Sequence, residues 1–304
     1  MTQGQSGATE FKARGIQSAL TISLRISMAG NGANWPYWHV DLNSGSGHNE
    51  RANCIGSPLA FIQAAESVGR GKYTAIFCDK NLDRISALQH KLIGNRRAEC
   101  VNWNNRELLP VLAERIEQTE RRPHFAWGSI LVDPNGYFDD ASVPHAELIE
   151  FASRFPRMDL LFNLNIRTYQ LGKPHVVGAK GRWASKFWPS PANFQHLFNR
   201  EHWLISNVRS VGGDRFCLFI GRSMKTGDHA SLGIYQFASD RGRAILADIE
   251  GADAQETAFD VSPLRDLSGV SAASNVSCSE GSSNAARQMD LQLMWSGRDG
   301  STPS

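Results

Sequence analysis

Short apolar runs alternate along the chain with longer segments whose apolar residues recur three or four positions apart. The short runs predict strands over residues 39–42, 73–78, 98–103, 128–132 and 158–163. The longer segments predict helices over residues 58–68, 82–92, 106–118 and 146–154. A further short helix or strand is expected near Ala19–Ser27. Strands that alternate with helices indicate an α/β fold built on a mostly parallel sheet.

Two later apolar runs, Trp203–Ser210 and Phe216–Ile220, are separated by a segment that contains Gly212-Gly213. A Gly-Gly pair suits a tight reversal between antiparallel strands. We therefore expect an antiparallel hairpin at the edge of the sheet. At the start of the first predicted helix after residue 42, Ser57-Pro58 predicts a capping hydroxyl followed by a proline at the first helical position.

Acidic residues follow three of the predicted strands. Asp41 ends the first strand, just before Gly45-Ser46-Gly47, while Asp79 and Asp133 end the second and the fourth. The carboxyl ends of parallel strands meet at one edge of a sheet, where α/β proteins bind nucleotide-type cofactors. We therefore expect a cofactor site to which these three acids and the two glycines contribute.

The glycine turn excludes two common cofactor motifs. Gly45-Ser46-Gly47 lacks the third glycine of the dinucleotide fingerprint, and Gly-Lys-Ser/Thr of the phosphate-binding loop is absent. The remaining pattern, Asp-x-x-x-Gly-x-Gly, is the form of S-adenosylmethionine sites. Asp79 would then accept hydrogen bonds from both ribose hydroxyls. The alternatives are a turn without a ligand and a solvated acid stabilised at a helix start.

The segment Asp133-Pro134-Asn135-Gly136-Tyr137 lies where amino-group methyltransferases carry Asp/Asn-Pro-Pro-Tyr/Phe. There the acid or amide accepts hydrogen bonds from the target amine, and the aromatic ring stacks on a flipped base. Asp133 and Tyr137 are accordingly the candidate catalytic residues. This copy departs from the motif, because Asn135 replaces the second proline and Gly136 is inserted. A type I turn is the alternative interpretation.

Basic and aromatic residues are interleaved between residues 165 and 225. This stretch contains ten Lys or Arg residues and only two acids. Cations for phosphates and rings for bases are typical of a surface that binds single strands or flipped bases. The candidate substrate contacts are Arg182, Trp183, Lys186 and Trp188. Phe194, Phe198 and Trp203 are expected to pack inward instead.

The composition limits the remaining choices. The 304 residues, 41% of them hydrophobic, suit one large α/β domain with an appendage or two small domains, and the net charge of +2 indicates no partner. Five scattered cysteines without a CxxC pair predict a reduced, cytoplasmic protein with neither a disulfide frame nor a metal site. No apolar segment among the first 30 residues is long enough for a secretory signal or a membrane span.

These patterns together resemble the three-Cys-motif partner protein family, which is similar to class I S-adenosylmethionine-dependent methyltransferases. The resemblance covers roughly residues 35–240. The segments that carry it are Val40-Asp41-Leu42-Asn43-Ser44-Gly45-Ser46-Gly47, Gly56-Ser57-Pro58-Leu59, Asp79, Val132-Asp133-Pro134-Asn135-Gly136 and Asp159-Leu160-Leu161-Phe162-Asn163. The family usually has Asp-Leu-Phe-Ala-Gly-Pro-Gly at the turn, whereas this chain has Asn43-Ser44 and Ser46.

The resemblance implies a Rossmann-like methyltransferase fold with an S-adenosylmethionine pocket at Asp41, Gly45, Gly47 and Asp79. It also suggests a separate cysteine-motif partner protein. We expect an N-terminal extension over 1–34, the methyltransferase-like domain over 35–240 with a basic insertion about 165–200, and a largely disordered tail rich in Ser, Gly and Asp over 241–304.

Three functions remain open from the sequence. The first is a methyltransferase that acts on nucleic acid, with an exocyclic amine as a candidate acceptor. The second is a non-catalytic partner protein that retains the fold and binds nucleic acid or a protein through its basic face. The third, a nucleotide-sugar or nicotinamide enzyme, is disfavoured by the missing glycine.

Overall fold

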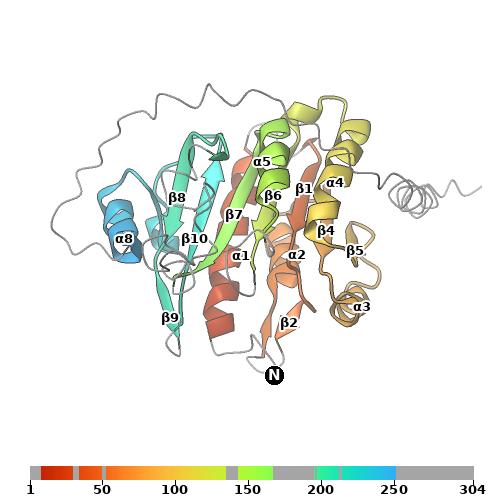
Figure 1. Cartoon of the computed structure of the whole chain (residues 1–304), viewed down its shortest axis with the longest axis horizontal. Coiled ribbons are helices and arrows are strands. Elements are labelled where there is room, and N and C mark those ends of the chain that lie inside the picture. Colours follow the sequence, from red (N-terminus) through yellow and green to blue (C-terminus); the bar gives the residue numbers. More distant parts are fainter. Residues whose placement is uncertain are drawn as a thin grey trace, which may run out of the picture. The chain divides into compact units, whose positions relative to one another are not determined.

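The computed structural model describes residues 8–29, 34–49, 53–134, 143–166, 195, 197–211 and 214–250. Its centre is a nine-stranded sheet with the order β11-β8-β10-β7-β6-β1-β4-β5, in which β9 also pairs with β10 (Figure 1). Five strands form the parallel part: β1 (Tyr37–Asp41), β4 (Tyr73–Cys78), β5 (Ala98–Val101), β6 (Trp127–Val132) and β7 (Met158–Asn165). The predicted parallel α/β sheet is thus confirmed.

Antiparallel strands complete the sheet beyond β7. They are β8 (His202–Ser206), β9 (Arg209–Val211), β10 (Asp214–Arg222) and β11 (Ile234–Gln236). β10 lies between β7 and β8 and is antiparallel to both. β9 and β10 pair across the predicted Gly-Gly reversal, with Val211 opposite Asp214. The short β11 pairs antiparallel with β8 and forms that edge of the sheet.

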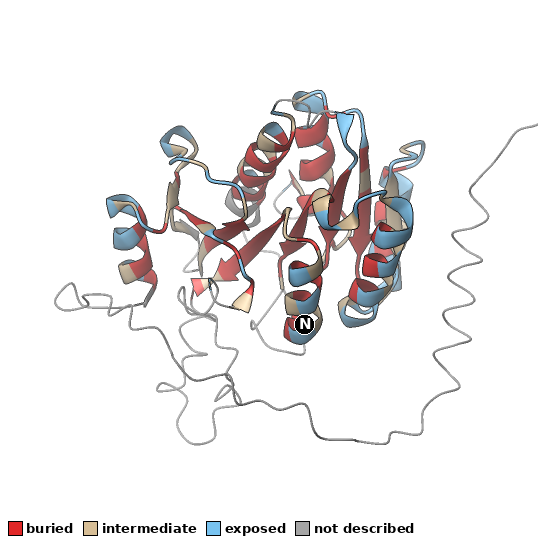
Figure 2. Ribbon diagram, turned by 90° about the horizontal axis from the view of Figure 1, so that it is seen from above, coloured by how far each residue is buried: buried red, intermediate tan, exposed pale blue. Residues whose placement is uncertain are grey.

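Helices cover both faces of the sheet (Figure 2). One face packs against α1 (Ala8–Ser27), α2 (Ser57–Ser67) and α3 (Leu82–Lys91). The other packs against α4 (Asn105–Thr119), α5 (His145–Arg154) and α8 (Asp240–Glu250). A two-stranded ribbon, β2 (His48–Asn49) with β3 (Cys54–Ile55), precedes α2. Within the described residues, no helix combines the length and the apolar character needed to cross a bilayer.

Helix α1 is longer than the element expected near Ala19–Ser27, since it begins at Ala8. Its last part is fastened to the sheet by a hydrogen bond to a buried ion pair between β7 and β10. The Ser23 hydroxyl donates to Asp159 Oδ2 at 2.5 Å, and the Arg222 guanidinium contacts the same oxygen at 2.8 Å. Arg222 is only 1% exposed. Because a buried charge is costly without a partner, this pair commits α1 to the sheet.

Two members of the basic stretch are structural rather than exposed. Arg222 belongs to the ion pair just described, and Arg200, also buried, donates to the carbonyl oxygens of Ala152 and Phe155 at the end of α5. Phe198 and Trp203 are buried in the core, as the sequence predicted. The local charge count therefore overstated the basic surface that this stretch provides.

Candidate active site

The order of the parallel strands reverses between β1 and β6, the place where ligands bind in open α/β sheets. Asp41 ends β1, while Asp79 and Asp133 directly follow the neighbouring strands β4 and β6. Burial, together with the nearby charges of Asp133 and Asp79, raises the pKa of the Asp41 carboxyl to about 7. The three acids predicted from the sequence therefore meet at one place.

The chain after β1 is held by the Asp41 side chain. Asp41 Oδ1 accepts the Asn43 N–H at 3.1 Å, and Oδ2 accepts the Ser57 hydroxyl at 2.5 Å. The hydroxyl of Ser57 was predicted to cap α2, but Gly56 is the N-cap residue and Ser57 lies inside the first turn. The prediction was wrong because Gly56 takes the N-cap position without a side-chain cap, and the Ser57 hydroxyl donates to the acid on β1 instead.

The two glycines of the turn have different surroundings, although both have left-handed backbone conformations. A Cβ on Gly47 would lie 2.5 Å from Leu88 Cδ1 of α3. In contrast, no described atom lies within 4 Å of the position that a Cβ on Gly45 would take. Gly47 thus lets α3 pack against the turn, whereas Gly45 leaves its backbone accessible to a ligand.

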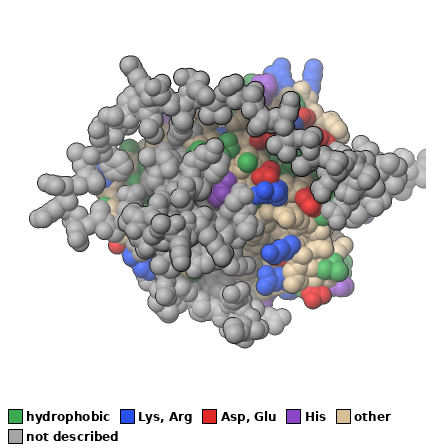
Figure 3. Space-filling view, viewed as in Figure 1, with side chains coloured by type: hydrophobic (Ala, Val, Ile, Leu, Met, Phe, Trp, Pro, Cys, Tyr) green, Lys and Arg blue, Asp and Glu red, His purple; other side chains and the backbone are tan. Residues whose placement is uncertain are grey.

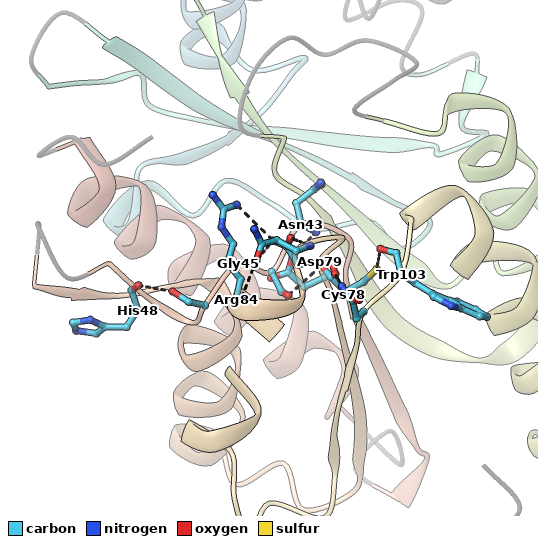
Figure 4. A network of polar contacts seen from close by, with 12 residues as sticks. Asn43, Gly45, His48, Cys78, Asp79, Arg84 and Trp103 are labelled. Atoms are coloured by element: carbon cyan, nitrogen blue, oxygen red, sulfur yellow. Dashed lines mark hydrogen bonds and ion pairs between the residues drawn. The ribbon is translucent and has the colours of Figure 1, made fainter. Parts of the chain in front are cut away.

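The Gly45 N–H donates to Asp79 Oδ2 at 3.0 Å, so two predicted cofactor residues contact each other directly (Figure 4). Asp79 Oδ1 accepts the Asn81 N–H at 2.8 Å, and the Arg84 guanidinium lies 3.8 Å from Oδ2. Asp79 is 7% exposed. Backbone groups from the turn and from the start of α3 therefore fix the orientation of this carboxylate.

Asp133 is oriented by a residue that the site prediction did not include. The Asn163 Nδ2 donates to Asp133 Oδ1 at 2.8 Å, and both residues are buried. An amide in the middle of the apolar strand β7 was the available signal, since a buried amide needs a polar partner. The other predicted residues, Tyr137, Arg182, Trp183, Lys186 and Trp188, lie outside the described residues.

No group of three or more His, Cys, Asp or Glu side chains that could hold a metal ion occurs in the described part of the chain. Four cysteines there are free thiols: Cys54, Cys78, Cys100 and Cys217. Cys78 lies next to the site, where burial raises the pKa of its thiol to about 12 and keeps it protonated at neutral pH. The described polar groups around the turn include the carboxylates of Asp41 and Asp79 and the backbone N–H of Gly45.

The strand order, the reversed strand β10 and the glycine turn after β1 together define a Rossmann-like methyltransferase fold of class I. No protein-family model and no curated protein sequence matches the chain. Among solved structures, it is similar to protein LPL1258 from Legionella pneumophila, with 11% identity, 72% of this chain and 88% of that chain covered, and a TM-score of 0.46.

Two further similar structures carry methyltransferase names. The putative methyltransferase yhhF from Escherichia coli is 13% identical over 69% of this chain and 86% of its own, with a TM-score of 0.34. The plantazolicin methyltransferase BamL, solved in complex with SAH, is 12% identical over 71% of this chain and 87% of its own, with a TM-score of 0.40. Likeness at this level does not transfer a substrate to this chain.

Proposed function

We propose that this protein is an S-adenosylmethionine-dependent methyltransferase that acts on nucleic acid, with an exocyclic amine as the candidate acceptor. One observation carries the proposal. The Gly45 N–H bonds the Asp79 carboxylate within a turn that leaves Gly45 open, beside the point where the strand order reverses. This arrangement brings a backbone that a ligand can approach next to an acceptor for hydroxyl groups.

The donor set of the site suits this cofactor. The two oxygens of Asp79 accept one backbone N–H each, which leaves further lone pairs for two ribose hydroxyls. Asp41, Asp79 and Asp133 together make the site acidic, which favours a cationic ligand. When bound, S-adenosylmethionine would supply a methyl group attached to a positively charged sulfur. An amine lone pair would attack the methyl carbon as the carbon–sulfur bond breaks.

Asp133 is the proposed contact for the acceptor. Because Asn163 donates to its Oδ1, the carboxylate is held in one orientation and can accept an N–H from an amine. Such a contact would point the nitrogen lone pair away from Asp133 and toward the methyl group. Tyr137 is proposed to stack on the target base. Arg182, Trp183, Lys186 and Trp188 are proposed to contact the nucleic acid around it.

Membership of the three-Cys-motif partner family, a cysteine-motif partner protein and a cytoplasmic location are parts of the same proposal. The expected limits of the methyltransferase-like domain were residues 35 and 240. The packed helix α8 extends from Asp240 to Glu250, with Ile245, Leu246 and Ile249 buried. We therefore infer that the methyltransferase-like domain extends to about the end of α8.

Calorimetric titration with S-adenosylmethionine tests the proposal, with Asp79→Ala and Asp83→Ala in parallel. Asp83 is an exposed acid in the first turn of α3 and serves as the matched control. We expect micromolar binding, a loss of roughly a hundredfold in Asp79→Ala because hydrogen bonds to a charged group are removed, and little change in Asp83→Ala. A folded protein that does not bind the cofactor would refute the proposal.

A non-catalytic partner protein is the second candidate. Arg84 lies 3.8 Å from Asp79 Oδ2 and already supplies a cation to the carboxylate that would hold the ribose. The turn also carries Ser44 and Ser46 where the family usually has other residues. Transfer of labelled methyl groups to mixed RNA and DNA separates the two candidates, since a partner protein would bind nucleic acid without methylating it.

A further inference from the structure

The edge of the sheet opposite the candidate active site is basic. Five segments precede the parallel strands there, over residues 34–36, 68–72, 92–97, 120–126 and 155–157. They contain seven Lys or Arg residues and a single acid, Glu120. We call this surface the amino edge. Figure 3 shows basic side chains projecting at the top of the molecule, the end at which the parallel strands begin.

Contacts between the segments, and the pairing of Tyr37 with Trp127 where β1 and β6 begin, bring the amino edge together as one surface. Arg70, before β4, donates to the carbonyl oxygen of Trp35, before β1. The Arg157 guanidinium, before β7, lies 4.2 Å from the centre of the Phe125 ring, before β6. Arg97, before β5, lies 5.4 Å from the ring centre of Tyr73. Since neighbouring strands are about 4.8 Å apart, the five segments span roughly 20 Å.

Five cations of this edge are exposed and lack an acidic partner among the described residues: Lys72, Arg96, Arg97, Arg121 and Arg122. Helices α2, α3, α4 and α5 end at this edge, and cations can stabilise the carboxyl end of a helix. Arg200 does so for α5 through hydrogen bonds to carbonyl oxygens. The side chains of the five exposed cations make no such bond in the described part of the structure.

Aromatic rings are interleaved with these cations. Trp35 is 43% exposed, and Phe125 and Trp127 are half-buried beside the exposed His124. The Arg157 guanidinium covers the rings of both Phe125 and Trp127. Cations that follow a phosphate backbone and rings on which bases stack are the two components of surfaces that bind single-stranded nucleic acid.

We propose that the amino edge is a binding surface for single-stranded nucleic acid, separate from the candidate active site. A partner that carries regularly spaced negative charges fits a row of exposed cations among which Glu120 is the single acid. A folded acidic protein would need shape complementarity, which side chains without fixed partners do not provide. The proposal does not depend on methyl transfer or on cofactor binding.

The experiment measures binding of labelled single-stranded RNA and DNA of about 16 nucleotides by the full chain over a series of salt concentrations. The variant is Arg96→Gln/Arg97→Gln/Arg121→Gln/Arg122→Gln. We expect binding to weaken roughly tenfold or more and the slope of log K against log salt to become shallower by up to about 3, from four lost phosphate contacts. A smaller loss of nucleic-acid binding is expected for Trp35→Ala, because this change removes a ring on which a base can stack.

Controls keep the outcomes distinguishable. Arg241→Gln/Arg243→Gln removes two exposed cations from α8, away from the amino edge, and is compared with Arg121→Gln/Arg122→Gln. Arg182→Gln/Lys186→Gln tests the proposed substrate contacts separately. Unfolding midpoints and calorimetry with S-adenosylmethionine establish that each variant is folded and that its cofactor site is unchanged.

Three results would overturn the proposal: an unchanged salt slope in the quadruple variant, equal weakening in the α8 control, or no binding by the unmodified protein. Loss of stability without loss of binding would assign these arginines to the helix ends instead. Sedimentation with anionic vesicles adds a further arm. If the quadruple variant alone lost binding to the vesicles but kept its binding to nucleic acid, the amino edge would be identified as a membrane-binding surface.

Discussion

The two edges of the parallel sheet carry opposite charges in different structural settings. At the carboxyl edge, Asp41, Asp79 and Asp133 are buried, and hydrogen bonds hold each carboxylate. At the amino edge, arginines such as Arg121 and Arg122 are exposed and have no acidic partner among the described residues. Fixed groups suit a small ligand of defined shape. Exposed cations without an acidic partner suit a polymer whose charges repeat, because each cation can meet a phosphate without prior alignment.

This separation also constrains the approach of a substrate. Three carboxylates at the carboxyl edge repel a phosphate chain, although they favour a cationic cofactor. A nucleic acid therefore needs cations from another part of the chain in order to reach Asp133. The proposed contacts Arg182 and Lys186 would serve this purpose close to the target base. The amino edge would retain the rest of the strand and raise its local concentration.

The largest expected effect concerns the buried layer beneath the amino edge. Asp159→Ala removes the carboxylate that pairs with Arg222 and accepts from Ser23. The variant leaves the Arg222 charge buried and unpaired, which should lower the free energy of unfolding by about 3–5 kcal/mol. Urea unfolding measures this, and Asp159→Leu/Arg222→Met should recover much of the loss. A change below about 1 kcal/mol would mean that Arg222 reaches water.

A smaller effect should sharpen the contrast at the carboxyl edge. Burial raises the pKa of Asp41 to about 7, above its ordinary value of 3.8. The folded state therefore binds the carboxyl proton of Asp41 more tightly than the unfolded state does. The stability that this bound proton contributes is lost as the pH rises from about 4 through about 7. Relative to Asp41→Asn, the unmodified protein should lose up to about 4 kcal/mol of unfolding free energy over this range.

Urea unfolding of both proteins at several pH values checks the linkage of Asp41. Only the difference between the two curves matters, because other groups titrate in both proteins. A difference that stays constant with pH would place Asp41 in its ionised form throughout. In Ser57→Ala, the loss of a hydroxyl that donates to Asp41 should raise the pKa of the carboxyl further.

The sequence predicted the carboxyl edge well, because its signals are local. Each acid directly follows or ends an apolar run, and topology alone brings three such ends together. Gly45 and Asp79 were placed in one site from this logic, and they share a hydrogen bond. The role of Ser57 was missed, since a hydroxyl at a helix start can accept a backbone N–H or donate to an acid, and only the folded chain shows that Asp41 is near.

The amino edge was not predicted, because its cations are spread over four separate segments and no single stretch of sequence stands out. Conversely, the stretch from 165 to 225 stood out by charge, yet Arg200 and Arg222 within it are buried. Counting charges along the chain cannot distinguish a guanidinium that caps a helix from one that faces water. The order of the strands decides which cations become neighbours.

The smallest expected effects compare one glycine from each edge. Gly47→Ala would place a Cβ 2.5 Å from Leu88 Cδ1, in a backbone conformation that alanine disfavours. We expect a loss of about 1–3 kcal/mol of unfolding free energy and weaker cofactor binding, because α3 must move away from the turn. Gly71, at the amino edge, has no described atom within 4 Å of its added Cβ and no left-handed backbone.

Gly71→Ala should therefore leave stability unchanged or raise it by about 0.4–1 kcal/mol, because alanine restricts the unfolded chain. Nucleic-acid binding at the amino edge should also persist, since the exposed cations there need no fixed backbone contact. Thermal unfolding and the salt series measure both effects. If Gly71→Ala weakened nucleic-acid binding as strongly as the loss of two arginines, the amino edge would be a shaped site, and its contrast with the carboxyl edge would fail.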